Sequence, residues 1–253
     1  MDCRDYQILN MKEINFAKQL ENIDPARLVN QRINDKVENF FLILGVFYND
    51  LKSLTFHLLQ TDNKFEGLNI GISPEVGEYG GIKNHLNRLT AAHIHEFFKF
   101  ISENKNVLEY QEFKFVYKEL NQDLKDRWDG IVNIAMGKKV NSSSDFSKIL
   151  LLIRNNLAFH YYQGGEVLRE GFIDYFYNFK KNEKNETAYY SVSDTMNETR
   201  FYYCDAAVER SMLNLMGRMK GDYIKKFDEV FRSVNFTVMA MMKEYIRQRP
   251  YKK

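Results

Sequence analysis

The chain has 253 residues, of which 44% are hydrophobic and 28% are charged, which excludes an intrinsically disordered protein and allows a sizeable buried core. The formal net charge is only +2, so any contact with nucleic acid must come from a local basic patch rather than from a global positive field. The sequence contains 3 proline and 13 glycine residues, and this scarcity favours long helices over a turn-rich β fold.

The N-terminal quarter of the sequence predicts two helical segments. Residues 8–22 fit a short amphipathic helix, and Asp24-Pro25 then fits an N-cap followed by a proline in the first helical turn. Apolar residues recur at spacings of three to five as far as about Gln60. This pattern predicts one long helix, or two helices joined near Asn49-Asp50.

The middle of the chain begins with the clearest break in the helical pattern. Residues 61–81 contain five glycines and Pro74, which predicts a loop or lid. Helical patterns resume at about 82–102 and 110–136. We therefore expect two further helices after this loop.

The C-terminal half predicts a helix over about 145–162, with Ser144 as its N-cap and Gln163-Gly164-Gly165 as its end. A variable insertion is expected at 180–204, where aromatic β-formers flanking polar residues predict a small β-hairpin near 187–204. The remaining helices are expected at about 166–179, 205–219 and 221–249, and the last two could instead form one long helix bent at Gly221. The predicted fold is a mostly α helical bundle over 1–253, as a single domain.

Two cysteines, Cys3 and Cys204, are too few for a disulfide framework or a thiolate zinc site. The histidines His93 and His95 are separated by two positions, which places them on opposite sides of a helix rather than around one ion. No glycine-rich phosphate loop precedes a Lys-Ser/Thr pair. We therefore expect neither a metal nor a cofactor. The absence of a signal peptide pattern and of a long apolar run predicts a cytoplasmic protein without a membrane partner.

The residue pattern that carries the most chemistry is Arg154-Asn155-Asn156-Leu-Ala-Phe-His160, late in an apolar helix. An arginine can hold a phosphate through its fork of donors, and a histidine can transfer a proton near neutral pH. Together they suffice for phosphodiester cleavage without a metal. On a regular α-helix the two side chains are about 120° apart, whereas Asn156 and His160 share a face.

This pattern resembles the Arg-x(4–6)-His signature of the HEPN superfamily, the all-helical domains of many bacterial RNase toxins and defence proteins. Five residues separate Arg154 from His160, Asn155 matches the polar residue that often follows the arginine, and Tyr162 matches the His-x-Tyr ending of HEPN toxins. The resemblance covers about ten residues and a general helical likeness over perhaps half the chain. It implies a HEPN-like bundle to which extra helices and the insertion have been added.

The resemblance implies a metal-independent endoribonuclease, a hydrolase of the toxin–antitoxin or antiviral phage-defence type. His160 would act as general base or acid for attack by the RNA 2′-hydroxyl, and Arg154 would stabilise the phosphorane. Asn155 and Asn156 would orient the phosphate or the histidine. The implied partners are RNA, a second copy of the chain that completes the cleft, and an antitoxin or regulatory protein.

Other interpretations of these residues remain open. Arg154 fits a structural cation near a helix C-terminus, and His160 fits a group that caps helix carbonyls. Tyr162 is a candidate for regulatory modification by resemblance to toxins silenced by adenylylation, although packing beside Phe159 and Tyr161 also explains it. The alternative functions are a non-catalytic HEPN-like module that binds a nucleotide or protein partner, and a helical interaction protein in which the Arg…His pattern is coincidental.

Overall fold

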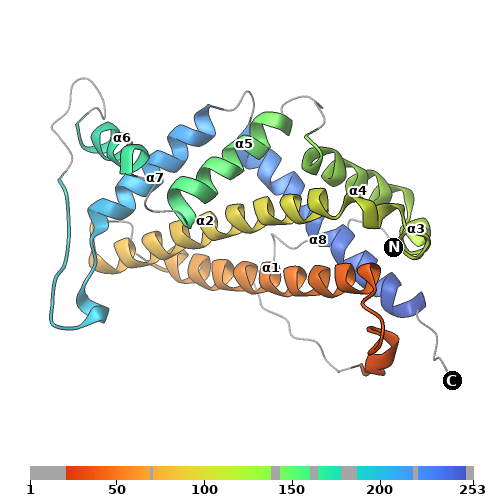
Figure 1. The fold of residues 1–253 in the computed structure, drawn as a ribbon. Coiled ribbons are helices and arrows are strands. Elements are labelled where there is room, and N and C mark those ends of the chain that lie inside the picture. The colour runs from red at the N-terminus through yellow and green to blue at the C-terminus, as the bar shows by residue number, and fades with distance from the viewer. Residues whose placement is uncertain are drawn as a thin grey trace. The chain divides into compact units, whose positions relative to one another are not determined.

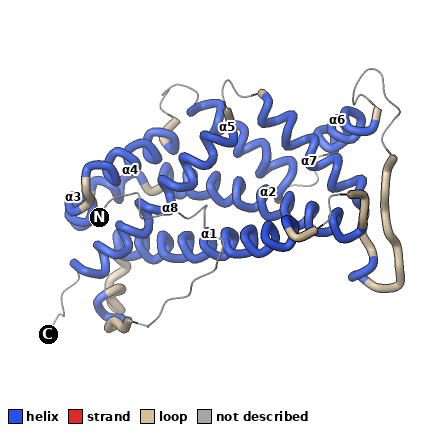
Figure 2. Tube along the Cα trace, turned by 180° about the vertical axis from the view of Figure 1, so that it is seen from behind, coloured by secondary structure: helices blue, strands red, loops and turns tan. Residues whose placement is uncertain are grey.

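A computed structural model describes residues 21–68, 71–137, 143–159, 165–177, 187–218 and 222–248. Within these ranges the chain forms eight α-helices and no β-strand, which confirms the prediction of a mostly α fold (Figures 1 and 2). The helices are α1 Lys36–Glu66, α2 Pro74–Glu103, α3 Gln111–Glu119, α4 Gln122–Ala135, α5 Ser143–Ile153, α6 Gly165–Phe176, α7 Tyr202–Gly217 and α8 Tyr223–Gln248. None of the described helices is both long and apolar enough to cross a membrane.

The chain divides into two compact units. The first unit comprises Met1–Ser53, Glu96–Ser143 and Ile224–Lys253, and the second comprises Leu54–His95 and Ser144–Tyr223. Helices α1 and α2 each contribute residues to both units. The prediction of a single domain stays a prediction.

The core of the first unit is built from aromatic side chains. Phe41 stacks on Tyr245 of α8 with ring centroids 4.1 Å apart, and Phe40 meets Phe113 of α3 edge to face at 5.7 Å. Phe113 in turn lies 5.9 Å from the ring of Trp128 on α4. Such pairs add to the stability gained from burying the rings themselves. The high aromatic content of the sequence is therefore used here to join α1, α3, α4 and α8.

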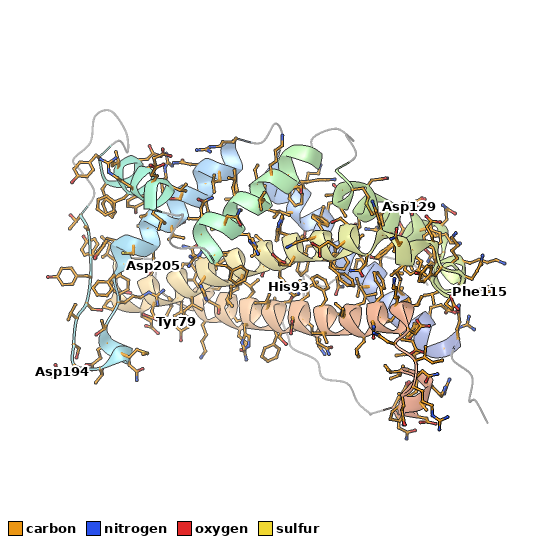
Figure 3. The ribbon with its side chains drawn as sticks, viewed as in Figure 1. Tyr79, His93, Phe115, Asp129, Asp194 and Asp205 are labelled. Atoms are coloured by element: carbon orange, nitrogen blue, oxygen red, sulfur yellow. The ribbon has the colours of Figure 1, made fainter. Side chains whose placement is uncertain are left out.

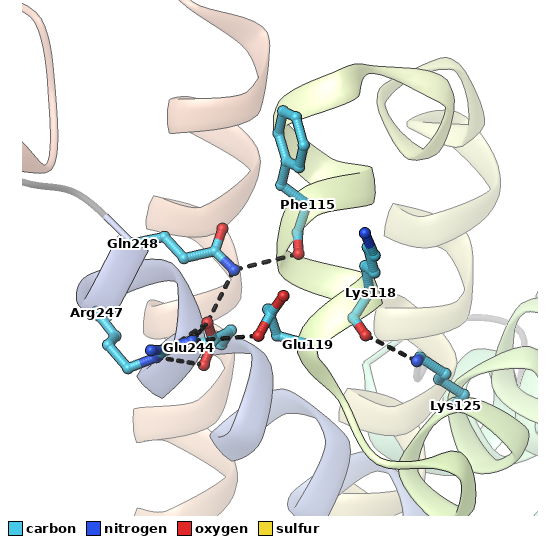
Figure 4. Close-up of polar contacts among 7 residues, drawn as sticks. All are labelled: Phe115, Lys118, Glu119, Lys125, Glu244, Arg247 and Gln248. Atoms are coloured by element: carbon cyan, nitrogen blue, oxygen red, sulfur yellow. Dashed lines mark hydrogen bonds and ion pairs between the residues drawn. The ribbon is translucent and has the colours of Figure 1, made fainter.

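Polar contacts fasten the end of α8 to α3 within the first unit (Figure 4). The side-chain amide of Gln248 donates to the Phe115 carbonyl at 3.1 Å, and Arg247 lies 3.4 Å from a carboxylate oxygen of Glu119. Glu244 accepts from both Arg247 and Gln248. These contacts pair Arg247 with two carboxylates, those of Glu119 and Glu244.

In the second unit, α6 packs closely against α7 (Figure 1). Gly171 permits this approach, because a Cβ there would lie 2.5 Å from the Ala207 carbonyl oxygen. The hydroxyl of Ser211 donates to the Val167 carbonyl at 2.9 Å, across the two helices. The small residue and the cross-helix bond together explain why these two short helices stay paired.

The glycines that predicted a lid over 61–81 are mostly helical, so that prediction is wrong over most of its length. Helix α1 continues to Glu66 and α2 begins at Pro74, which leaves a connection of residues 67–73. Gly77 and Gly81 lie inside α2, where a Cβ would come within 2.5 Å of the Tyr202 ring and 2.7 Å of the Arg200 guanidinium carbon, respectively. These glycines therefore make room for the side chains of Arg200, just before α7, and of Tyr202, its first residue.

Two helix boundaries also differ from the sequence predictions. Asp24 does cap a helical turn, with its side chain accepting from the Ala26 amide at 3.0 Å, but this is a three-residue 3-10 turn, Pro25–Arg27. The long helix begins at Lys36, where Asp35 provides a second cap. The helix predicted at 110–136 is two helices, because Asn121 accepts from the Leu124 amide and starts α4.

The hairpin predicted near 187–204 reduces to one isolated antiparallel bridge between Ser191 and Arg200. The two residues exchange backbone hydrogen bonds of 2.8 and 2.9 Å, and α7 begins only two residues later. A helix that starts at Tyr202 leaves no room for a second strand. All but the last two residues of the helix predicted at 8–22 lie outside the described residues, as does the first part of the 180–204 insertion.

Candidate functional site

The helix that carries the Arg…His pattern changes its hydrogen bonding at the arginine. Regular α structure runs from Ser143 to Ile153, and a π-helical turn follows over Arg154–Ala158. The Phe159 amide donates to the Arg154 carbonyl at 3.1 Å, which is a bond between residues five apart. A π turn inserts one extra residue into a helix and is found frequently at functional sites. We call residues 154–158 the π turn.

The π turn holds three of the five residues that the sequence singled out. Arg154 and Asn155 are half-buried, and the Arg154 guanidinium donates to the Asn155 side-chain oxygen at 2.9 Å. Asn156, also half-buried, donates its side-chain amide to the Leu152 carbonyl at 2.9 Å. Arg154 and Asn155 are therefore brought together, whereas Asn156 satisfies a carbonyl of the helix itself. A guanidinium presents five donors, so a phosphate contact is compatible with the Asn155 bond.

His160 and Tyr162 lie outside the described residues, so their relation to Arg154 stays a prediction. The angle of about 120° between Arg154 and His160 assumed regular α geometry. A π turn begins at Arg154 and precedes His160 in the sequence, so regular α geometry does not apply between the two residues. The angle of about 120° is therefore not an argument against a site formed by Arg154 and His160 of one chain.

A buried arginine from another helix reaches the π turn. Arg88 of α2 is 7% exposed and donates through one guanidinium nitrogen to the Leu157 carbonyl. Its Nε donates to the Asn84 carbonyl at 3.3 Å, and its other guanidinium nitrogen lies 3.4 Å from Nδ1 of His85. Arg88 thus links α2 to the motif segment within the second unit. Arg88 is not among the site residues predicted from the sequence.

Charged groups continue along the same side of α2. Arg200 forms ion pairs with Glu78 at 2.6 Å and with Asp205, in the first turn of α7, at 2.8 Å. Asp205 is labelled in Figure 3. The imidazole of His85 is exposed, yet partial burial and the positive charges of Arg88 and Arg200 lower its pKa, with Asp205 acting in the opposite direction. His85 therefore presents a neutral imidazole near pH 7.

These residues were not predicted as site residues because the first part of α2 was assigned to a loop. Gly77, Gly81, His85 and Arg88 follow one another at spacings of four, four and three, which places them along one face of a helix. That signal becomes visible only when α2 is taken to begin at Pro74. Assigning residues up to 81 to a loop removed the first half of the pattern.

A mostly apolar pocket of about 340 Å³ lies at the start of α2 and α7, all within the second unit. Its aromatic lining comes from Tyr189, Tyr190 and Tyr202, and Gly77 forms part of its wall. Among the residues that the structure describes, no group of three or more His, Cys, Asp or Glu side chains is arranged to hold a metal ion.

No protein-family model, curated protein or solved structure matches this chain. The likeness to the HEPN superfamily therefore rests on the residues of the motif.

Proposed function

We propose that the protein is a metal-independent endoribonuclease of the HEPN toxin or phage-defence type. The observation that carries this proposal is the π turn, which pairs Arg154 with Asn155 at the position of the Arg-x(4–6)-His pattern. A functional arginine must be held in one orientation and still reach solvent, and a half-buried guanidinium bonded to its neighbour meets both needs.

In the proposed reaction the RNA 2′-hydroxyl attacks the adjacent phosphorus. His160 takes the hydroxyl proton or donates a proton to the departing 5′-oxygen, and Arg154 stabilises the additional negative charge on the phosphorane. Asn155 orients the Arg154 guanidinium. The products are a 2′,3′-cyclic phosphate and a free 5′-hydroxyl, and DNA is resistant because it lacks the attacking hydroxyl.

The remaining parts of the proposal come from the family resemblance. A second copy of the chain would complete the cleft, with the motif segments of two protomers facing one another. An antitoxin or regulatory protein would restrain the activity, and modification of Tyr162 would be one route to that restraint.

The test compares the wild type with Arg154→Ala, His160→Ala and Lys148→Ala on single-stranded RNA in EDTA. Lys148 is an exposed basic residue on α5, so its variant controls for the loss of one positive charge near the motif. We expect cleavage by the wild type and Lys148→Ala, and a loss of about 100-fold or more in the other two variants. Products should carry a 2′,3′-cyclic phosphate, and an all-deoxy substrate should stay intact.

Three outcomes would contradict the proposal. Equal cleavage by all four proteins would indicate a contaminating nuclease. Cleavage that requires a divalent metal would exclude the proposed chemistry. Binding of RNA, nucleotide or protein without cleavage by any preparation would favour the non-catalytic HEPN-like module.

A further inference from the structure

We infer that Arg88 is a positioning residue that holds the π turn in place and thereby sets the orientation of Arg154. Its effect on catalysis depends on the proposed ribonuclease function. Its effect on the π turn does not, and the two can be measured separately.

The contacts of Arg88 place a buried cation between two segments of the second unit. The guanidinium donates to the Leu157 carbonyl in the π turn and, through Nε, to the Asn84 carbonyl one helical turn back along α2. Leu157 itself is fully buried, so the carbonyl that Arg88 reaches belongs to a well-packed residue. A hydrogen bond from a charged donor is stronger than one between neutral groups.

The π turn needs such donors because it disturbs the regular pattern of backbone bonds. In an α-helix the Ala158 amide would bond to the Arg154 carbonyl, but here the Phe159 amide does so. Asn156 supplies a side-chain donor to the Leu152 carbonyl at the entry of the turn, and Arg88 supplies one to the Leu157 carbonyl near its end. The two side chains therefore support the turn from both ends.

Removing the Arg88 donor would leave the Leu157 carbonyl without this partner in a buried environment. Without that support the turn can relax towards α geometry, in which the Ala158 amide bonds to the Arg154 carbonyl in place of the Phe159 amide. That change alters the direction in which the chain leaves Arg154. If the proposed function holds, it misplaces Arg154 relative to the phosphate on which it acts.

The experiment compares Arg88→Met, Arg88→Lys and Arg218→Met with the wild type. Methionine keeps much of the length of the side chain and removes all its donors, whereas lysine restores a charge and a donor. Arg218 is a matched control in the second unit, because its side chain is 59% exposed and its pairing with Glu170 is long, at 4.0 Å. Two readouts are needed: amide hydrogen exchange by NMR, centred on Ala158 and Phe159, and steady-state RNA cleavage.

For Arg88→Met we expect the amides of Ala158 and Phe159 to exchange faster, because the π turn loses one of its supports, while α6 and α7 stay protected. The kcat for RNA should fall by about 10- to 100-fold with little change in KM, and Arg88→Lys should recover part of both properties. Arg218→Met should resemble the wild type. If Arg88→Met loses protection throughout the second unit, Arg88→Lys decides the question by the same criteria.

Unchanged exchange at Phe159 in Arg88→Met would overturn the inference, whatever the activity. A local change at Phe159 with unchanged kcat would overturn the catalytic part. If the wild type has no ribonuclease activity but Arg88→Met still alters exchange at Phe159, the proposed function fails and the structural role of Arg88 stands.

Discussion

Replacing Gly171 by alanine tests whether the close approach of α6 and α7 is essential to the second unit. A Cβ at this position would lie 2.5 Å from the Ala207 carbonyl oxygen and 3.0 Å from the Ser211 amide nitrogen. Both are backbone atoms of α7, so no change of rotamer relieves the contact. Alanine at 171 must therefore push the two helices apart.

The size of the effect follows from these distances. An ordinary contact of 3.4 Å exceeds the Ala207 distance by about 0.9 Å, so α6 must shift by roughly that amount. The shift stretches the bond from Ser211 to the Val167 carbonyl, now 2.9 Å, and disturbs the ion pair between Arg210 and Asp174. Overpacking of this kind costs about 1–3 kcal/mol, and the better helix propensity of alanine offsets about 0.5–1 kcal/mol. The expected net loss of stability is about 1–2 kcal/mol.

Gly130→Ala is the matched control, because Gly130 lies within α4 and a Cβ there would meet nothing within 4 Å. The same substitution should stabilise the protein there by about 0.5–1 kcal/mol. Thermal unfolding followed by circular dichroism should give Tm changes of opposite sign, at about 2–4 °C per kcal/mol for a chain of this size. Hydrogen exchange in Gly171→Ala should accelerate in α6. Equal Tm changes for the two variants, or an unchanged exchange rate in α6, would refute the reasoning.

Two further predictions concern pH. Burial, Arg88 and Arg200 lower the pKa of the His85 imidazole from its ordinary 6.5, so on acidification the unfolded chain binds a proton at His85 before the folded chain does. The free energy of unfolding should therefore fall as the pH drops below about 6.5. Urea unfolding at pH 5.5 and 7.5 should show a smaller fall in His85→Gln than in the wild type. An equal fall in the two proteins would contradict the assignment. Burial and the hydrogen bond to Asp129 raise the pKa of Tyr117 to about 12, so its contribution to stability should disappear between about pH 10 and 12. Tyr117→Phe should remove that alkaline loss and cost about 0.5–1.5 kcal/mol near pH 7; a variant that still loses stability as steeply as the wild type would exclude this tyrosine.

The helices that the sequence predicted correctly are those whose pattern is local. Apolar periodicity identified the greater part of α1 and the positions of α5, α6, α7 and α8, because burial of one helix face leaves a repeat that can be counted. The error at Asn121 was avoidable, since asparagine is among the best N-caps and its side chain does accept from Leu124. Apolar periodicity continues on both sides of Asn121, so one helix was predicted over 110–136 although asparagine is a typical N-cap residue.

The glycines of α2 were assigned to a loop because helix propensity takes no account of the distant residues that pack against them. A glycine within a helix costs up to about 1 kcal/mol relative to alanine, so several together favour a loop. At Gly77 and Gly81 that cost is offset by the packing of Tyr202 and Arg200 against the helix backbone. Both partners are more than 100 residues away in the sequence. Glycine is the better residue at these two positions only because Tyr202 and Arg200 pack there in the folded chain.

The candidate site shows the same dependence on distant residues. The sequence identified Arg154 and Asn155 by type and spacing, and the structure bonds them to one another. The sequence near Arg154 did not predict the π turn, because the turn is supported by Arg88, which lies 66 residues before Arg154. A pattern of the form Arg-x(4–6)-His has a variable spacing, and a π turn absorbs one residue of such a spacer without moving the residues on either side of it. In this chain the five-residue spacer includes the extra residue of the π turn. The proposed site requires the chain to leave Arg154 in a constant direction. Arg88 is the side chain in a position to fix that direction, because it bonds to the Leu157 carbonyl within the turn.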